Sequence, residues 1–322
     1  MNLIADSWTE LVKSAVFFHL DMEKFGRLQD FFAALDVDFF RRIADFEFGE
    51  FPEEEVKSRF SADDQSRLLL LVVVANCQKM QAYYRQNSFP VRMLDLISYD
   101  LNIWMKTMER DLGFYGLTWE IFEWQSHCLF GRIKQFGRLQ CNDFHYFNVK
   151  RSFYRNADGV LQSAADRKMI PASAPVMLNW QDPCINLHIP ASGPLERKDC
   201  IAAIKNMTEF YRKFYPEYDY RAIVCYSWLL SRQFRQLLPP ESNIIQFQDL
   251  GHNFDIPEIN QDKAVRWRLW DAAAREKTPD ELVCRTSLQS KVVEFWKNGG
   301  SFFEGGLIIF PDELPGLFEE LD

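Results

Sequence analysis

The sequence predicts an α/β (α+β) fold, in which a mainly helical N-terminal domain precedes a mixed sheet flanked by helices. Three observations lead to this prediction. Apolar residues between positions 94 and 108 recur at steps of three and four, which places one apolar stripe along a helix. Apolar and polar residues alternate from 184 to 189, which is the period of a strand. A helical period from 200 to 214 then precedes another apolar run, and such a strand–helix–strand normally forms a right-handed crossover between parallel strands.

Length and charge limit the classes of protein to consider. The chain has 322 residues, more than one ordinary core usually organises, so we expect two domains, at 1–134 and 135–322. Hydrophobic residues make up 47%, which is enough apolar material for packed cores and excludes a disordered chain. The formal charge of −9 disfavours general attraction to nucleic acids or to anionic membranes.

The cysteines and the first residues predict a cytoplasmic protein. Seven cysteines are scattered without a C-x-x-C pair, as expected for reduced thiols rather than for a disulfide framework or a zinc site. The first residues lack the pattern of a signal peptide, and the longest apolar run, 68–75, is too short to span a bilayer. No metal-ligand motif, P-loop or dinucleotide-binding fingerprint occurs, so we expect no metal.

Capping residues mark helices in the N-terminal half. Ser61, with Asp64 three residues later, resembles a capping box that opens a helix to about residue 85. Pro90 suits the first turn of a helix that ends near Gly113, and Thr118 can cap a third helix to about residue 132. Shorter helices are expected around 15–18, 31–35 and 39–44, and a solvated connector is expected at 50–55.

The C-terminal half is expected to consist of strands and helices. A first strand is predicted at 136–141, and the turn signal Asn156-Ala-Asp-Gly159 predicts a loop or hairpin within 155–175. Further strands are predicted at 184–189, 221–230, 242–247, 264–270 and 306–310, with helices from about 194 to 214 and from 287 to 297.

The turn between residues 190 and 195 is the most informative local feature. A helix that begins near Pro194, directly after a strand, presents unpaired backbone amides and a partial positive charge that suit a phosphate or carboxylate. Gly193 allows a ligand to approach, and Arg197 lies in the first turn. Glu196 and Asp199 complement the same helix dipole without any ligand, so both interpretations stay open.

Polar residues on two of the strands are the candidates for catalysis. His188 has a side chain suited to proton transfer near neutral pH, and it shares one face of its strand with Asn186. In the next strand Cys225 and Ser227 share a face, and Tyr226 lies on the other. Cys225 is a candidate nucleophile. The alternatives are a histidine satisfied by hydrogen bonds within the protein and a buried thiol that acts as a small apolar residue.

Short motifs spread along the chain carry a family resemblance. They are Gly137-Arg-Leu-Gln140, His188-Ile-Pro190 with Gly193-Pro-Leu195, Cys225-Tyr-Ser-Trp-Leu229, Ser242-Asn-Ile244 and Thr286-Ser-Leu-Gln289. In this order they resemble a bacterial family of acyltransferase-domain proteins, which have a helical N-acyltransferase domain followed by a GNAT-like C-terminal domain. The resemblance extends over nearly the whole chain.

The resemblance implies that acyl-CoA lies between two splayed parallel strands, here 184–189 and 221–230, with its pyrophosphate at the start of the following helix. His188 becomes the base or polariser, and Ser227 and Asn243 become orienting residues. The turn departs from the family in having one glycine, and 231–238 lacks the tyrosine that often acts as general acid. The residues placed at the cofactor are Ile189, Ser192, Gly193, Leu195 and Arg197.

The expected function is therefore an acyl-CoA-dependent N- or O-acyltransferase, with acetyl-CoA or another acyl-CoA as co-substrate and a small molecule as acceptor. The alternative is a non-catalytic GNAT-like module that binds a ligand or a protein. A weaker alternative is a hydrolase that uses Cys225 with His188.

Overall fold

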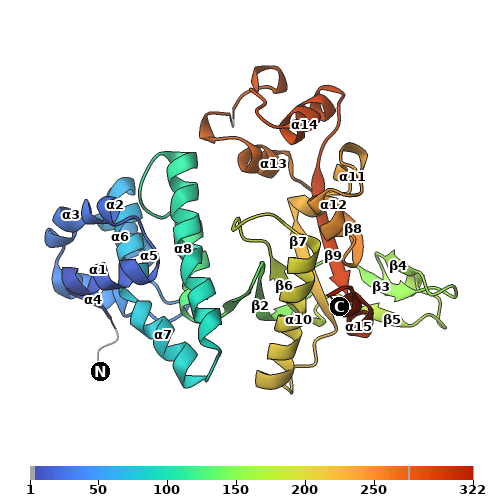
Figure 1. Ribbon diagram of the computed structural model, residues 1–322, viewed down its shortest axis with the longest axis horizontal. Helices are drawn as coiled ribbons and strands as arrows, with labels where there is room; N and C mark the ends of the chain where they lie inside the picture. The colour runs from blue at the N-terminus through green and yellow to red at the C-terminus, as the bar shows by residue number, and fades with distance from the viewer. Residues whose placement is uncertain (1–3, 275, 322) are drawn as a thin grey trace. The chain divides into compact units, whose positions relative to one another are not determined.

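Residues 4–274 and 276–321 are described by a computed structural model of the chain (Figure 1). The chain divides into two compact units, Met1–Gln135 and Phe136–Asp322. The first unit is built mainly from helices, and the second from sheets flanked by helices, as the sequence predicts. Over the described residues, no helix is both long enough and apolar enough to cross a membrane.

The helical unit is organised around α6 (Ala62–Ala75). Residues 68–75 are all fully buried, because this part of the helix is apolar on every side and other helices pack around it. The other helices of this unit are α1 (Trp8–Phe17), α2 (Met22–Gly26), α3 (Gln29–Ala33), α4 (Val37–Ala44), α5 (Glu53–Arg59), α7 (Cys77–Gln86), α8 (Val91–Leu112) and α9 (Trp119–Leu129).

Capping residues set helix limits at the predicted places. Ser61 Oγ accepts a hydrogen bond from the Asp64 backbone N–H at 3.3 Å, and Thr118 Oγ1 accepts one from that of Ile121 at 3.3 Å. α8 ends before Gly113, whose φ of 72° lies in the left-handed region that glycine adopts without strain.

Two predictions for this unit are wrong. The helix expected from 61 to 85 is interrupted at Asn76, whose Nδ2 donates hydrogen bonds to the carbonyls of Val72 at 2.8 Å and Ala44 at 2.9 Å. Side chains of this type compete with the helix backbone for hydrogen bonds, so the chain ends α6 here and starts α7. Of the connector expected at 50–55, residues 53–55 form the first turn of α5, where these acidic residues complement the helix dipole.

The described residues contain a mixed sheet whose strand order is β1-β2-β6-β7-β9-β8. β6 and β7 run parallel and are connected by α10 (Arg197–Phe214), as the predicted crossover requires. β2 pairs with β6, and β9 with both β7 and β8, in antiparallel fashion. The strands are β1 (Ile133–Phe136), β2 (Leu139–Tyr146), β6 (Pro183–His188), β7 (Ala222–Ser227), β8 (His252–Asn260) and β9 (Phe303–Ile309).

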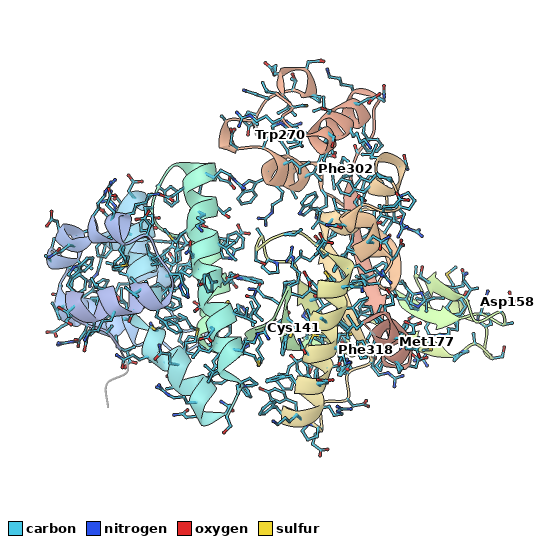
Figure 2. All side chains as sticks on the ribbon, in the orientation of Figure 1. Cys141, Asp158, Met177, Trp270, Phe302 and Phe318 are labelled. Atoms are coloured by element: carbon cyan, nitrogen blue, oxygen red, sulfur yellow. The ribbon has the colours of Figure 1, made fainter. Side chains whose placement is uncertain are left out.

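Different elements cover the two faces of this sheet. α10 lies on the face of Leu187, because Cys141, which is opposite Leu187 in the register, contacts the Tyr211 hydroxyl with its Sγ at 3.4 Å (Figure 2). The other face packs against the small sheet β4-β3-β5, where Phe153 joins Val224 in one buried cluster. The strands of the small sheet are β3 (Ser152–Arg155), β4 (Leu161–Ala164) and β5 (Val176–Leu178).

A second apolar cluster is formed mainly by the helices that follow β7. It includes Trp270 and Phe302, which Figure 2 labels, and also Phe234, Val265 and Val292. These helices are α11 (Phe234–Leu237), α12 (Asn243–Gln248), α13 (Asp262–Leu269) and α14 (Ser287–Lys297), and α15 (Leu314–Phe318) lies near the end of the chain. The limits of α14 are those predicted.

Several segments of this unit differ from the predictions. The strand expected at 136–141 is divided: residue 136 ends β1, Gly137 lies in the hairpin turn at a φ of 72°, and residues 139–141 begin β2. The strand expected at 242–247 is α12, because Ser242 Oγ caps a helix by accepting from the Ile245 N–H at 3.4 Å. The strand expected at 264–270 is α13, where Val265 is buried and the residues beside it are partly exposed. β8 was not predicted.

Other boundaries move by a few residues. β7 ends at Ser227, and residues 228–230, expected in the strand, form a 3-10 turn. α10 begins at Arg197 rather than near Pro194, so the segment before it is a longer loop than predicted. The hairpin expected within 155–175 is present between β3 and β4, with Gly159 at a φ of 77° in the turn.

Candidate functional site

The parallel pairing of β6 and β7 stops before either strand ends, and we call the unpaired ends of these two strands the opening. Their parallel register runs from Cys184 opposite Ala222 to Leu187 opposite Cys225 and includes no later residue. Beyond it, β6 stays paired with β2 through His188, opposite Gln140, and β7 stays paired with β9 through its last residue. The two strands are therefore held by different partners at their carboxyl ends.

The sheet register assigns the candidate residues to two faces. Asn186 is opposite Val224, so His188 and Tyr226, two residues further along each strand, lie on this same face. Cys225 is opposite Leu187 and points to the α10 side, as does Ser227. The structure thus places His188 and Tyr226 together and puts Cys225 and Ser227 on the opposite face.

His188 is held by a neighbouring amide. Its Nε2 lies 2.8 Å from Asn142 Oδ1 on β2, and the Asn186 Nδ2 lies 3.5 Å from the same nitrogen. Because a carbonyl oxygen only accepts hydrogen bonds, Nε2 is the donor in the short contact. Asn142 therefore fixes the orientation of a half-buried imidazole at the end of β6.

Three buried polar atoms lie on the His188 face without a hydrogen bond of normal geometry to any described residue. They are His145 Nε2 on β2, Asn186 Oδ1 on β6 and Tyr226 Oη on β7, three neighbouring strands. Burial raises the pKa of Tyr226 strongly, an effect that the nearby Asn148 amide only partly offsets, so the phenol stays protonated. Burial lowers the pKa of His145. Buried polar atoms without a partner are uncommon in folded proteins, which makes these three atoms candidates for contact with water or a ligand.

Cys225 and Ser227 are poorly placed for the roles considered above. Cys225 is 1% exposed, and burial raises the pKa of its thiol far above the ordinary value, so the reactive thiolate does not form. Ser227 Oγ accepts a hydrogen bond from the Leu229 N–H at 3.2 Å and starts the 3-10 turn. Neither shares a face with His188, which removes the Cys225–His188 pair that a hydrolase needs.

The turn after β6 is exposed, and hydrogen bonds from Arg138 hold it in place. Residues 191–194 are exposed, and a Cβ at Gly193 would meet no atom within 4 Å. Arg138, in the β1–β2 turn, donates hydrogen bonds to the carbonyls of Pro194 at 2.7 Å, Pro190 at 2.8 Å and Gly193 at 2.9 Å. The carbonyl dipoles, which would repel an anion, are thereby directed to a protein cation.

The first residues of α10 are bound to the protein itself. Glu196 is the N-cap, but no side chain caps the helix. Arg197 donates to both carboxylate oxygens of Glu320, at 2.7 and 2.6 Å, and to the Gln246 carbonyl at 2.8 Å, and the bond to Glu320 raises its pKa. Asn243 Nδ2 donates to Glu196 Oε1 at 3.2 Å. Arg197 and Asn243 thus tie α10 to α12 and to the C-terminal segment.

The remaining predicted residues flank the turn. Ile189 is half-buried directly after β6, Ser192 is exposed, and Leu195 is buried with 7% of its surface accessible. Of the cofactor residues expected from the sequence, Ser192 and Gly193 are therefore the ones with surface to offer a ligand, while Leu195 anchors the loop.

Glu304 was missed by the sequence analysis. It lies on β9 opposite Ile256, two residues before Gly306, which is opposite Tyr226, so it shares the face of Tyr226 and His188. It is half-buried, and burial raises its pKa. The signal in the sequence was an acid directly before Gly305 in an apolar segment, but the predicted strand started at 306 and excluded it.

A separate cavity of about 810 Å³ lies in the helical unit, lined by residues that include Lys24, Ser66, Arg67 and Tyr115. None of the residues predicted for the site lines it. Within the described chain, no group of three or more His, Cys, Asp or Glu side chains is arranged to hold a metal ion.

Comparison with known proteins agrees with this architecture. Residues 133–308 match the family model of the GNAT-like C-terminal domain. An acyltransferase crystallised with decanoyl-CoA is similar in fold, with a TM-score of 0.61 and 16% identity over 94% of this chain and 100% of that one. An acyltransferase with decanoyl-CoA and teicoplanin gives a TM-score of 0.55 and 17% identity over 93% and 99%. No curated protein matches the sequence.

Proposed function

We propose, from the premise that this chain belongs to the GNAT-like C-terminal domain family, that it is an acyl-CoA-dependent acyltransferase acting on a small acceptor. The observation that carries the proposal is that the pairing of β6 and β7 stops at Leu187 and Cys225, with His188 directly beyond it on β6. The similar acyltransferase structures, which contain acyl-CoA, support the same assignment.

The turn after β6 fits the phosphates of CoA. Its residues 191–194 are exposed, and there is open space beside Gly193. Arg138 forms hydrogen bonds with the carbonyls of the turn, and no side chain caps the N-terminus of α10. Ser192 and Gly193 would contact the phosphates, with Ile189 beside the more apolar part. When bound, acyl-CoA supplies an acyl group activated as a thioester.

Two side chains on the opening supply the chemistry. His188 is the base or polariser, and its ring orientation is preset by Asn142, so little reorganisation is needed when an acceptor arrives. Tyr226 keeps its proton and can donate a hydrogen bond to the oxygen or sulfur on which negative charge develops. Ser227, considered above as an orienting residue, lies on the other face.

Titration with CoA and with decanoyl-CoA tests the proposal. Saturable thermal stabilisation of the protein is expected, because a ligand that binds only the folded state raises the melting temperature. His188→Asn should retain this stabilisation and lose acyl transfer by about 10²-fold or more, the usual contribution of a general base. His19→Asn, at an exposed histidine of the helical unit, is the matched control.

The outcomes separate the candidate functions. A flat response to CoA at millimolar concentration would reject acyl transfer and favour the non-catalytic binding module. Binding with unchanged transfer in His188→Asn would keep the acyltransferase and remove His188 from its mechanism.

A further inference from the structure

Glu304 lies at the same end of the sheet as His188. β9 is separated from β6 by the single strand β7, and strands lie about 4.8 Å apart, so the two backbones are about 10 Å apart. Tyr226, on β7, lies on the same face opposite Gly306, and Glu304 lies two positions, about 7 Å, further along β9. Two proton-accepting side chains therefore flank one opening from opposite sides, with a phenol between.

The carboxyl group of Glu304 has no partner in the part of the chain that the structure describes. Among the described residues it makes no hydrogen bond and no ion pair, although it is half-buried. Its nearest neighbours in the sheet are apolar: Ile256 is opposite it, and the Phe254 ring covers Gly306 so closely that a Cβ there would lie 2.1 Å from it. Such surroundings disfavour the charged form, and burial accordingly raises the pKa of Glu304.

The charge of Glu304 acts on titratable residues of β7. Glu304 lies on β9 beside β7, just before the residues that pair with Ser227 and Tyr226. Burial is the main reason why the pKa values of Tyr226 and Cys225 are raised, and the charge of Glu304 adds to it. The titratable group that faces Glu304 from β7 is Tyr226, and His188 lies beyond it on β6, whereas the β8 neighbours Phe254 and Ile256 carry no charge. No protein cation neutralises this carboxylate within the described structure, and a partly buried unpaired charge costs folding free energy.

We propose that Glu304 is a second proton acceptor of the reaction site, which binds the reacting ammonium group of an amine acceptor. This inference rests on the proposed acyltransferase function. An amine reaches the site at neutral pH as an ammonium ion, so two protons must leave it during acyl transfer. A hydroxyl acceptor loses one proton, and a single base suffices for it.

The proton balance uses both sides of the opening. The ammonium passes one proton to the Glu304 carboxylate, and the freed nitrogen lone pair forms the bond to the acyl carbon. The carbon–sulfur bond breaks, and its electron pair stays on the CoA sulfur. The second proton of the nitrogen passes to His188, and the thiolate takes a proton from solvent. Amide, CoA thiol and two protonated side chains result, and the side chains return their protons to water with a net release of one.

The first experiment follows the Glu304 carboxyl directly. The full chain is labelled with [δ-¹³C]glutamate, and the Glu304 resonance is identified by its loss in Glu304→Gln. Millimolar n-hexylammonium should lower its titration midpoint, because a bound cation stabilises the carboxylate. n-Hexanol, which has the same chain without the charge, should leave it in place. A midpoint that neither probe moves, or that both move equally, overturns the inference.

The second experiment measures transfer from decanoyl-CoA to n-hexylamine. Glu304→Gln should reduce the rate about 10²-fold or more with CoA affinity unchanged, and Glu304→Asp should recover part of it. Glu294→Gln, the same change at an exposed position of α14, is the control. If wild-type protein transfers and Glu304→Gln transfers equally well, the inference fails and the acyltransferase stands. If wild-type protein does not acylate n-hexylamine, the inference is accepted or rejected on the titration of the Glu304 carboxyl.

Discussion

Arg138→Ala should loosen the turn proposed to hold the CoA phosphates. The guanidinium donates hydrogen bonds to three carbonyls of the segment 190–194. Of these three bonds, only the one to Pro190 is partly shielded from water. A hydrogen bond from a charged donor contributes about 1.5–3 kcal/mol when shielded, and exposed ones contribute far less because water replaces them. We therefore expect the substitution to lower the free energy of unfolding by about 2–3 kcal/mol.

The same substitution should weaken CoA binding about tenfold. Without the brace, the turn must be ordered when the ligand binds, and ordering one backbone residue costs about 1–2 kcal/mol, against 1.4 kcal/mol for each factor of ten in affinity. Hydrogen exchange at the amides of 191–195 and calorimetric titration with CoA measure the two effects.

Control variants separate bracing from charge. Arg138→Lys keeps the charge but presents a single ammonium, so it should recover little of the loss. Arg221→Ala removes an exposed arginine elsewhere in the unit and should change neither measurement. Wild-type exchange rates together with wild-type CoA affinity in Arg138→Ala would refute the reasoning.

Three further predictions concern stability and reactivity. The pKa of Glu304 is higher in the folded state than in the unfolded state, so the folded state binds the proton more tightly. The free energy of unfolding therefore falls as pH rises from the unfolded pKa to the folded pKa. Glu304→Gln should therefore raise the melting temperature at about pH 7, with a gain that shrinks toward about pH 4; an equal gain at both would contradict this. Iodoacetamide should label exposed Cys284 in the native protein and leave buried Cys225 unlabelled, as peptide mass mapping can check. Thr286→Ala should cost about 1–2 kcal/mol in chemical denaturation, because the Thr286 hydroxyl caps α14 and Gln289 completes the box; Thr286→Ser should not.

Elements that carry both a cap and a clear period could be predicted from sequence. α14 begins after Thr286 and ends at Lys297 as expected, since the cap and the apolar stripe specify the same element. Gly113 marked the end of α8, because its left-handed conformation favours glycine. The parallel pairing of β6 and β7 followed from the length of the intervening helix.

Short segments whose structure depends on tertiary contacts could not be predicted. Residues 242–247 and 264–270 have apolar compositions that suit strands, yet both are helices packed into the cluster around Phe302. Ser242 was a cap that the sequence analysis did not use. Asn76 ends α6 through a hydrogen bond to Ala44, which is distant in the sequence and invisible to local pattern analysis.

The candidate site was predicted in part. The sequence identified the turn at 190–195 and placed His188 next to it, because both lie on one continuous segment. It could not decide whether Cys225 or Tyr226 shares a face with His188, since that depends on the register between two strands. Arg138 and Glu304 come from distant segments, and the roles proposed for them rest on contacts and burial that exist only in the folded chain.

The opening beside His188 is built by backbone pairing rather than by side chains. β2 holds the end of β6 and β9 holds the end of β7, and the β9 pairing requires glycine at 305, where a Cβ would lie 1.9 Å from the Leu230 carbonyl oxygen. Substitutions at His188, Tyr226 or Glu304 leave these hydrogen bonds intact, so they should change proton transfer without closing the opening. Gly305→Ala, in contrast, should disturb the strand pairing itself and abolish CoA binding together with stability. This difference makes the side-chain variants tests of chemistry and the glycine variant a test of architecture.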